Sequence, residues 1–260
     1  CRYQRKLAWR NERTLYRRTC DSCSKSIVTM YHPDSPLVVY CSSCWWGDGW
    51  DAKSFGQDID FSRPFFEQFK ELQAKVPRVA LLSKNSINSE YCNHTTNSKN
   101  CYLSTAAFNS ENVMYSSNTL PGKNCCDVYR VEGAACENLY ESINVHNSYN
   151  CQFCYVITSS FDCLYSFDLK GCSNCFLSSN LRNKSYCFNN QQLSKEEYFK
   201  QLSQFNLASY ETRQLLYTKW IDIIKKSLHK SVIGESCVDC TGNFMFNSKN
   251  SKHIFDSEKI

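Results

Sequence analysis

A twelve-residue repeat is the feature of this sequence that most constrains its fold. It occurs nine times between residues 86 and 190, with openings at Ser86, Ser98, Ser110, Gly122, Cys136, Ser148, Ser160, Cys172 and Lys184. Every step is twelve residues except the one from Gly122 to Cys136, which is fourteen. A short fixed period indicates a solenoid, because each unit buries its inner face only by stacking on its neighbours. We therefore expect a mainly β protein, with a parallel β-solenoid over residues 85–193.

Particular places within the repeat have constant chemistry. The third place is Asn in seven of the nine units, and Asn suits bends because it tolerates left-handed backbone and its amide can bond to neighbouring groups. We expect an Asn ladder there, with the fourth, seventh and tenth places facing inward. Cysteines recur at the fourth place, at Cys101, Cys125, Cys151, Cys163, Cys175 and Cys187. Buried Cys behaves as a small hydrophobe, so we interpret these residues as solenoid core; a metal or redox chain is the alternative.

The length of one coil could be twelve or twenty-four residues. Alternate units differ at the fourth place, where Cys101 and Cys125 are separated by Val113, and at the sixth place, where Tyr91 and Tyr115 are separated by Leu103. Stacking aligns each place with its equivalent one full turn away. The alternation therefore favours about 24 residues per coil, with two related sides.

Two close cysteine pairs precede the repeats. Cys20-x2-Cys23 and Cys41-x2-Cys44 are separated by seventeen residues, a spacing typical of a four-thiolate zinc site. Four protein ligands leave no open coordination position, so we expect structural zinc in a ribbon over residues 19–53. Disulfides between the pairs are the alternative.

The first eighteen residues are strongly basic. They read as a helix over residues 1–18, without Gly or Pro, and carry Arg2, Arg5, Lys6, Arg10, Arg13, Arg17 and Arg18. Such residues interleaved with aromatic rings could contact nucleic acid. The alternative is a solvated helix packed on the ribbon. The net charge of +5 is unevenly spread, since residues 86–191 hold six Lys or Arg against eight acids.

The other segments are predicted to be helical or repetitive. A connecting helix within 54–84, begun by Ser62, could cap the open end of the array with its phenylalanines. Two helices are expected over 194–232, and a second repeat array begins over 233–260. Cys237 and Cys240 are either half of a zinc site or strand residues of that array. We expect the chain to be part of a longer protein.

The composition indicates the compartment. No apolar run approaches the ~18 residues of a membrane span, and the Arg-rich start is not a secretory signal. We expect no membrane partner. Eighteen Cys, used as core filler and metal ligands, suit a reducing environment. The predicted location is the cytoplasm.

Several motifs together resemble a known group of sequences. They are Leu7 to Arg13, Cys20 to Cys23, Tyr40 to Trp46, Asp60 to Phe69 and the Asn-Cys repeats. They are similar to an uncharacterised family of large zinc-ribbon and Cys-rich-repeat proteins predicted from uncultivated bacteria. The resemblance implies a further Cys pair before the Arg-rich stretch and more repeats after it, and it implies no particular activity.

These features favour a non-enzymatic protein that binds or organises a macromolecule, either protein or nucleic acid. The alternative is a β-helix enzyme acting on a polysaccharide. Such an enzyme needs acids or bases clustered in a groove, whereas the acids of the array fall on different places of the repeat. We therefore assign no catalytic residue.

Overall fold

The protein is mainly β, with one large and mostly parallel sheet and few helices. The computed structural model describes residues 14–133 and 136–259. Of these, residues 14–133 and 136–224 form one compact unit, and residues 225–259 belong to a second. No helix in the described ranges is long and apolar enough to cross a membrane.

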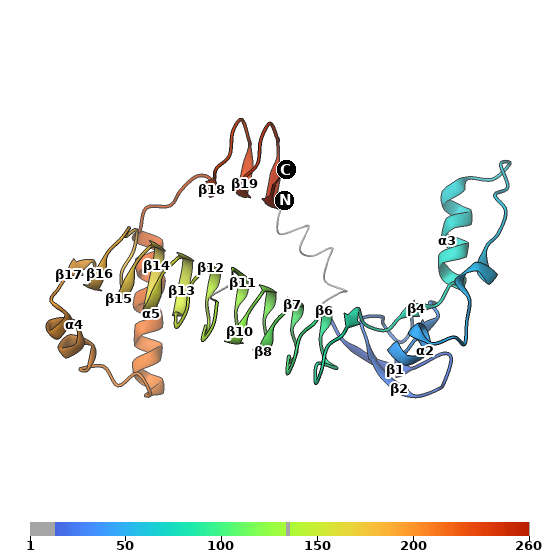
Figure 1. Ribbon diagram of the computed structural model, residues 1–260, viewed down its shortest axis with the longest axis horizontal. Coiled ribbons are helices and arrows are strands. Elements are labelled where there is room, and N and C mark those ends of the chain that lie inside the picture. Colours follow the sequence, from blue (N-terminus) through green and yellow to red (C-terminus); the bar gives the residue numbers. More distant parts are fainter. Residues whose placement is uncertain (1–13, 134–135, 260) are drawn as a thin grey trace. The chain divides into compact units, whose positions relative to one another are not determined.

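The elements follow one another along the chain as labelled in Figure 1. The strands of the first unit are β1 (Tyr16–Thr19), β2 (Ser26–Thr29), β3 (Val39–Tyr40), β4 (Arg78–Val79), β5 (Ser83–Lys84), β6 (Asn93–Thr96), β7 (Thr105–Phe108), β8 (Glu111–Met114), β9 (Ser117–Leu120), β10 (Lys123–Cys126), β11 (Tyr129–Glu132), β12 (Ile143–His146), β13 (Gln152–Thr158), β14 (Phe161–Lys170), β15 (Ser173–Phe176), β16 (Ser185–Phe188) and β17 (Gln191–Gln192). The second unit holds β18 (Gly234–Glu235), β19 (Gly242–Phe246) and β20 (Ile254–Glu258). The helices are α2 (Ser42–Trp46), η2 (Ala52–Phe55), α3 (Phe65–Lys75), α4 (Lys195–Leu202) and α5 (Tyr210–Lys226).

The repeats build a sheet of eleven strands whose order follows the chain, from β5 to β17. Its neighbours are parallel except for the final hairpin of β16 and β17. Paired residues in the repeats are twelve apart: Asn93 lies beside Thr105, and Cys163 lies beside Cys175. The expectation of about 24 residues per coil is therefore wrong, since such a coil would pair residues 24 apart. We number the coils 1 to 9 from the openings given above.

The alternation that suggested the longer coil has a different cause. Cys101, Val113, Cys125 and Leu139 are all buried at the fourth place of successive coils. Neighbouring strands are about 4.8 Å apart, and the fourth-place residues of successive coils stack in one column. Small and large residues therefore alternate along this single column in coils 2–5, and not between two sides of a longer coil.

The backbone bends at every third residue. All nine third-place residues have positive φ, between 50° and 56°, which confirms the predicted bends. The sixth, ninth and twelfth places share this conformation in most coils, for example at Leu103, Ala106 and Asn109. Each bend turns the following side chain inward, so the buried column residues occupy the first, fourth, seventh and tenth places. The first place was not predicted to face inward.

Side-chain ladders connect the coils. The Asn88 amide donates to Asn100 Oδ1 at 3.0 Å, and Asn100 in turn donates to Asn112 at 3.1 Å. This confirms the predicted Asn ladder. A second ladder at the twelfth place joins Asn85, Asn97 and Asn109. Stacking therefore satisfies amide groups as well as burying apolar ones.

Buried serines bind the backbone of two coils at once. Ser160 Oγ donates to the carbonyl of Thr158 at 2.9 Å and accepts the N–H of Cys172 at 3.0 Å. We expect Ser160→Ala to reduce the free energy of unfolding by about 1–3 kcal/mol, because the buried N–H of Cys172 loses its acceptor. Ser160→Cys is the control, since Cys136 and Cys172 stand naturally at the first place. Urea unfolding should show the smaller loss for Ser160→Cys; equal losses would contradict this role.

Helices α4 and α5 cover the outer face of the last coils. Phe153, Tyr165, Phe176 and Leu177 form one cluster with Tyr198, Leu216 and Trp220 of these helices. The indole N–H of Trp220 donates to the carbonyl of Ser166 at 3.1 Å. Ser194 caps α4 by accepting the N–H of Glu197 at 3.1 Å, the backbone half of a capping box.

Helix α3 does not cap the array as expected. Its phenylalanines Phe65, Phe66 and Phe69 are exposed, and only Gln68 is buried. Ser62 does not cap it either: Pro64 holds the N-cap position, and Ser62 Oγ donates to Asp60 instead. The Gln68 amide fixes the incoming loop by donating to the carbonyls of Asp60 and Arg63.

The second unit repeats the same design. Strands β18, β19 and β20 are parallel, and β19 and β20 pair with an offset of twelve residues, as at Met245 and Ser257. The thiol of Cys237 donates to the carbonyl of Glu235, and that of Cys240 to the carbonyl of Val238. The array cysteines of the first unit bond in the same way to the carbonyl two residues earlier, so this pair resembles array cysteines.

Candidate metal centre

The first cysteine pair lies in the turn of an antiparallel hairpin. Strand β1 pairs with β2 from Tyr16 to Thr19, and Cys20 follows directly. Its N–H donates to the carbonyl of Lys25, and Ser24 supports the tight turn with a φ of 58°. Residues 16–18 were expected in the basic helix, but here they form β1. Pairing with β2 across this turn overrides the helical preference of the Arg residues.

The second pair lies at the start of a short helix. Cys41 follows β3 and caps α2, and its Sγ accepts the N–H of Cys44 at 3.4 Å. Cys20 Sγ accepts the N–H of Cys41 at 3.2 Å. The two turns that carry the cysteine pairs, which we call knuckles, thus direct backbone N–H groups at sulfur atoms. Such hydrogen bonds favour the thiolate form of the cysteines.

The four sulfur atoms meet in one group. Cys20, Cys23, Cys41 and Cys44 have sulfur atoms within 4.8 Å of one another, and the group could bind a metal ion. Cys23 Sγ and Cys41 Sγ are 3.8 Å apart. Tetrahedral zinc with Zn–S bonds of about 2.3 Å requires a sulfur separation of about 3.8 Å. The donor set and its geometry therefore fit a tetrathiolate centre.

The thiol pKa values show how charge is distributed in this group. Burial raises the pKa of Cys41, but hydrogen bonds from the Ser43 hydroxyl and the N–H of Cys44 outweigh it and lower the pKa to about 6. For Cys44, the hydrogen bond with Ser22 lowers the pKa, while the neighbouring sulfurs of Cys41 and Cys23 raise it to about 12. Several thiolates cannot share this small space without a cation, which is what a metal ion would supply.

The ribbon is joined to the chain that enters the array. Strand β3 pairs in parallel with β4, and the carbonyl of Ala80 accepts both the N–H of Met30 and the Thr29 hydroxyl. The Asn93 amide of coil 1 contacts Met30 Sδ at 3.2 Å. These bonds hold the metal centre beside the first coil.

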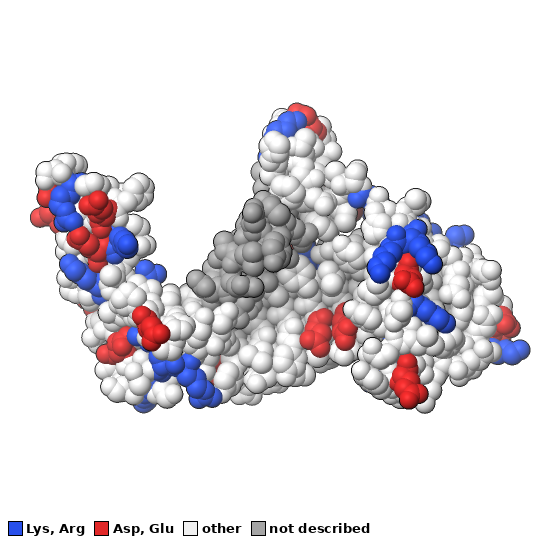
Figure 2. All heavy atoms as spheres, turned by 180° about the vertical axis from the view of Figure 1, so that it is seen from behind, with Lys and Arg blue, Asp and Glu red and all other residues white. Residues whose placement is uncertain are grey.

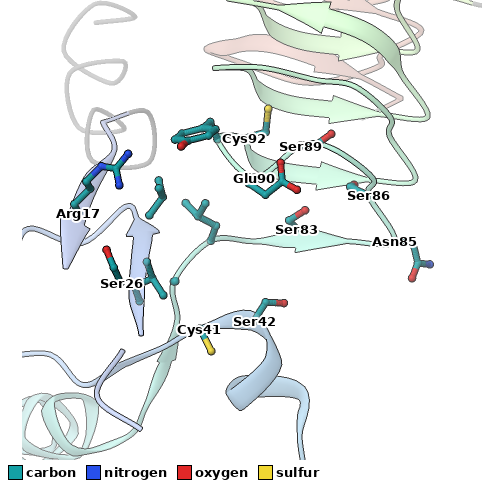
Figure 3. Close-up of a pocket in the computed structure, with 15 residues that line it drawn as sticks. Arg17, Ser26, Cys41, Ser42, Ser83, Asn85, Ser86, Ser89, Glu90 and Cys92 are labelled. Carbon is teal, nitrogen blue, oxygen red and sulfur yellow. The ribbon is translucent and has the colours of Figure 1, made fainter. Parts of the chain in front are cut away.

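A hollow separates the ribbon from the first coil. Figure 3 shows Arg17 and Ser26 on the ribbon side, with Ser86, Ser89 and Cys92 opposite. The volume is about 560 Å³. The array side of this hollow includes Ser86, Ser89 and Cys92 at the first, fourth and seventh places of coil 1, together with the outward-facing Glu90 and Tyr91.

The basic residues are only partly described. Arg17 lines the hollow, while Arg18 bonds to Asp21 Oδ2 at 3.0 Å and to the carbonyl of Leu37. Arg18 therefore has a structural role within the ribbon. Arg2, Arg5, Lys6, Arg10 and Arg13 lie outside the described residues.

The six array cysteines of the fourth place are all buried: Cys101, Cys125, Cys151, Cys163, Cys175 and Cys187. Burial raises the pKa of Cys125 to about 11. In the last coils neighbouring thiols also interact, and hydrogen bonds from Cys163 and Cys172 lower the pKa of Cys175 relative to that of Cys125. Each thiol donates to a carbonyl, for example Cys163 to Phe161 at 3.3 Å. These contacts describe core side chains without access to solvent.

Sequence reasoning missed one surface feature. The fifth and sixth places of most coils carry large side chains that point outward; the alternation at the sixth place was interpreted only as an indication of coil length. Their recurrence beside an inward-facing fourth place is the signal that could have identified them, because neighbouring residues of a strand face opposite sides.

The chain was compared with known proteins. No family model and no curated protein matches it. Among solved structures, a chain described as a proposed acetyltransferase of Bacillus cereus has 12% identity, covering 55% of this chain and 93% of its own. Its TM-score of 0.15 is too low to indicate a shared fold.

Proposed function

We propose that this is a non-enzymatic binding or scaffold protein, in which a structural zinc ribbon holds one end of a rigid parallel β-solenoid. The observation that supports this proposal is that polar side chains of the array form hydrogen bonds between coils. Ser160 and its equivalents bond between coils, and Asn88, Asn100 and Asn112 bond to one another. Side chains engaged in this way are structural, and a stiff stack presents an extended surface to a partner.

Zinc is the proposed cofactor. Cys20, Cys23, Cys41 and Cys44 would hold it as thiolates, and the ion would neutralise their charge and fix the two knuckles. Four cysteine ligands complete the coordination sphere, which supports a structural rather than a catalytic centre. The described cysteines are free thiols, which supports a reducing compartment such as the cytoplasm.

Nucleic acid is one proposed partner, contacted through the basic N-terminal residues. On the face shown in Figure 2, positive and negative side chains are intermixed. Intermixed charges attract phosphates only weakly. We therefore assign the phosphate contacts to the first eighteen residues, where the positive charge is concentrated. Arg17 is the one member of that set with a described position at the hollow.

A binding titration tests this partner. The intact chain should bind fluorescent duplex or single-stranded nucleic acid at 50 mM salt, and affinity should fall by about 10-fold or more at 200 mM salt because bound counterions are released. Replacing Arg5, Arg10, Arg13 and Arg17 by Gln should abolish binding. The control replaces Lys195, Lys200, Lys225 and Lys226 of α4 and α5 in the same way. Absence of binding at low salt would exclude nucleic acid, and cleavage of a polysaccharide would contradict a non-enzymatic function.

A further inference from the structure

We propose that the outer face of coils 1–3 is a docking surface for an amphipathic α-helix of a partner protein. The surface, which we name the tyrosine stripe, comprises Tyr91, Tyr102, Leu103, Met114 and Tyr115. This inference rests on the proposed binding function and specifies where a protein partner would bind and what it would present.

The stripe is exposed and continuous. Relative exposures run from 37% at Tyr91 to 52% at Tyr115. The ring of Tyr102 lies 5.6 Å from that of Tyr91 and 5.7 Å from that of Tyr115, edge to face in both cases. Three successive coils thus present one connected aromatic surface.

The same places are covered by a helix farther along the array. The sixth-place residues Phe153, Tyr165 and Leu177 of coils 6–8 are 7%, 2% and 5% exposed. Trp220 and Leu216 of α5 pack in that cluster, and the ring of Trp220 lies 6.4 Å from that of Phe153. The protein therefore already uses this face to bind a helix.

The uncovered and covered coils have matching chemistry. The sixth place reads Tyr91, Leu103 and Tyr115 in coils 1–3, against Phe153, Tyr165 and Leu177 in coils 6–8. Both sets contain two aromatic rings and one leucine. Because equivalent places of a solenoid have equivalent geometry, a helix with the apolar face of α5 fits the tyrosine stripe.

Charge further specifies the partner helix. Glu90 and Asp127 are exposed at the fifth and sixth places beside the stripe, and these two places carry no Lys or Arg in coils 1–4. In the covered region, Glu141 lines a hollow together with Arg213 of α5. A matching partner helix therefore carries Arg or Lys beside a face of Leu and Trp side chains.

The experiment uses the full chain and a defined probe. The probe is a fluorescent peptide of residues 209–231, which contains α5, and its anisotropy reports binding. We expect saturable binding that weakens at least 10-fold in the receptor variant Tyr102→Ser/Tyr115→Ser. Replacing Leu216 and Trp220 of the peptide by Ala should weaken binding equally. The matched control is Tyr149→Ser, since Tyr149 has the same 41% exposure as Tyr102 but lies at the second place; its affinity should stay within twofold.

Several results would overturn the docking proposal. One is that the peptide does not bind, and another is that Tyr149→Ser weakens binding as much as Tyr102→Ser/Tyr115→Ser does. A third is that the chain associates with itself and that Tyr102→Ser/Tyr115→Ser abolishes this association, which would assign the tyrosine stripe to a second copy of the chain. If removal of residues 1–13 makes the peptide bind tenfold more tightly, the tyrosine stripe would instead be the binding surface of that segment. Loss of nucleic-acid binding in Tyr102→Ser/Tyr115→Ser would assign it to bases. If the peptide does not bind but nucleic acid still binds in a salt-sensitive way, only the docking proposal is wrong. If the peptide binds but nucleic acid does not, the docking proposal stands and nucleic acid is excluded as a partner.

Discussion

A full-length chain carrying Cys20→Ser and Cys41→Ser will contain no zinc, and its ribbon will unfold while the array remains folded. The native chain should contain about one zinc ion, because four thiolates of one site hold one ion. Structural zinc contributes roughly 10–16 kcal/mol of apparent binding free energy in small domains, far more than β1 and β2 can replace by packing. Elemental analysis measures the ion, and hydrogen exchange measures amide protection in β1 and β2.

The control for this prediction is the variant Cys237→Ser/Cys240→Ser, because Cys237 and Cys240 have the same Cys-x2-Cys spacing as each of the two ribbon pairs. These thiols bond to carbonyls in the second unit, so the variant should retain zinc and ribbon protection. Zinc loss from the control, or a full complement of zinc in Cys20→Ser/Cys41→Ser, would show that the metal lies elsewhere.

The second large effect is expected in the inner columns. Ile157→Ala should lower the free energy of unfolding by about 2–5 kcal/mol, because it removes buried methyl groups and leaves a cavity. Ile157 is fully buried at the tenth place of coil 6, whereas Ile143 of the preceding coil is 40% exposed. Ile143→Ala is the matched control and should cost about 0.5 kcal/mol or less. Urea unfolding measures both; similar losses at the two positions would contradict the assignment of inner and outer places.

Local chemistry explains which features were predictable from sequence. Asn in the left-handed bends follows from a steric rule that acts within a single residue, and the inward-facing fourth and seventh places follow from the short repeat period. The cysteine pairs at Cys20 and Cys41 were equally readable, because metal ligation imposes a characteristic spacing. In each case the residue type reports its own environment.

Features that depend on distant partners were predicted less well. Coil length depends on which strands pair. Alternation of Cys101 with Val113 along one column of twelve-residue coils gives the same sequence pattern as a 24-residue coil with two different sides. Residues 16–18 became a strand through pairing with β2. The position of α5 on coils 6–8 depends on contacts such as that of Trp220 with Ser166, 54 residues apart. Sequence periodicity contains no information on such contacts.

A distance between labelled coils tests most directly whether one coil of the array contains about twelve residues rather than about 24. Nitroxide labels attached through keto amino acids at Lys99 and Tyr149, both exposed at the second place, avoid the native cysteines. Four coils separate these positions, three of twelve residues and one of fourteen, so pulsed electron paramagnetic resonance should give a distance near 19 Å, from a rise of about 4.8 Å per coil. A distance near 10 Å, the rise of two longer coils, would contradict the twelve-residue coil.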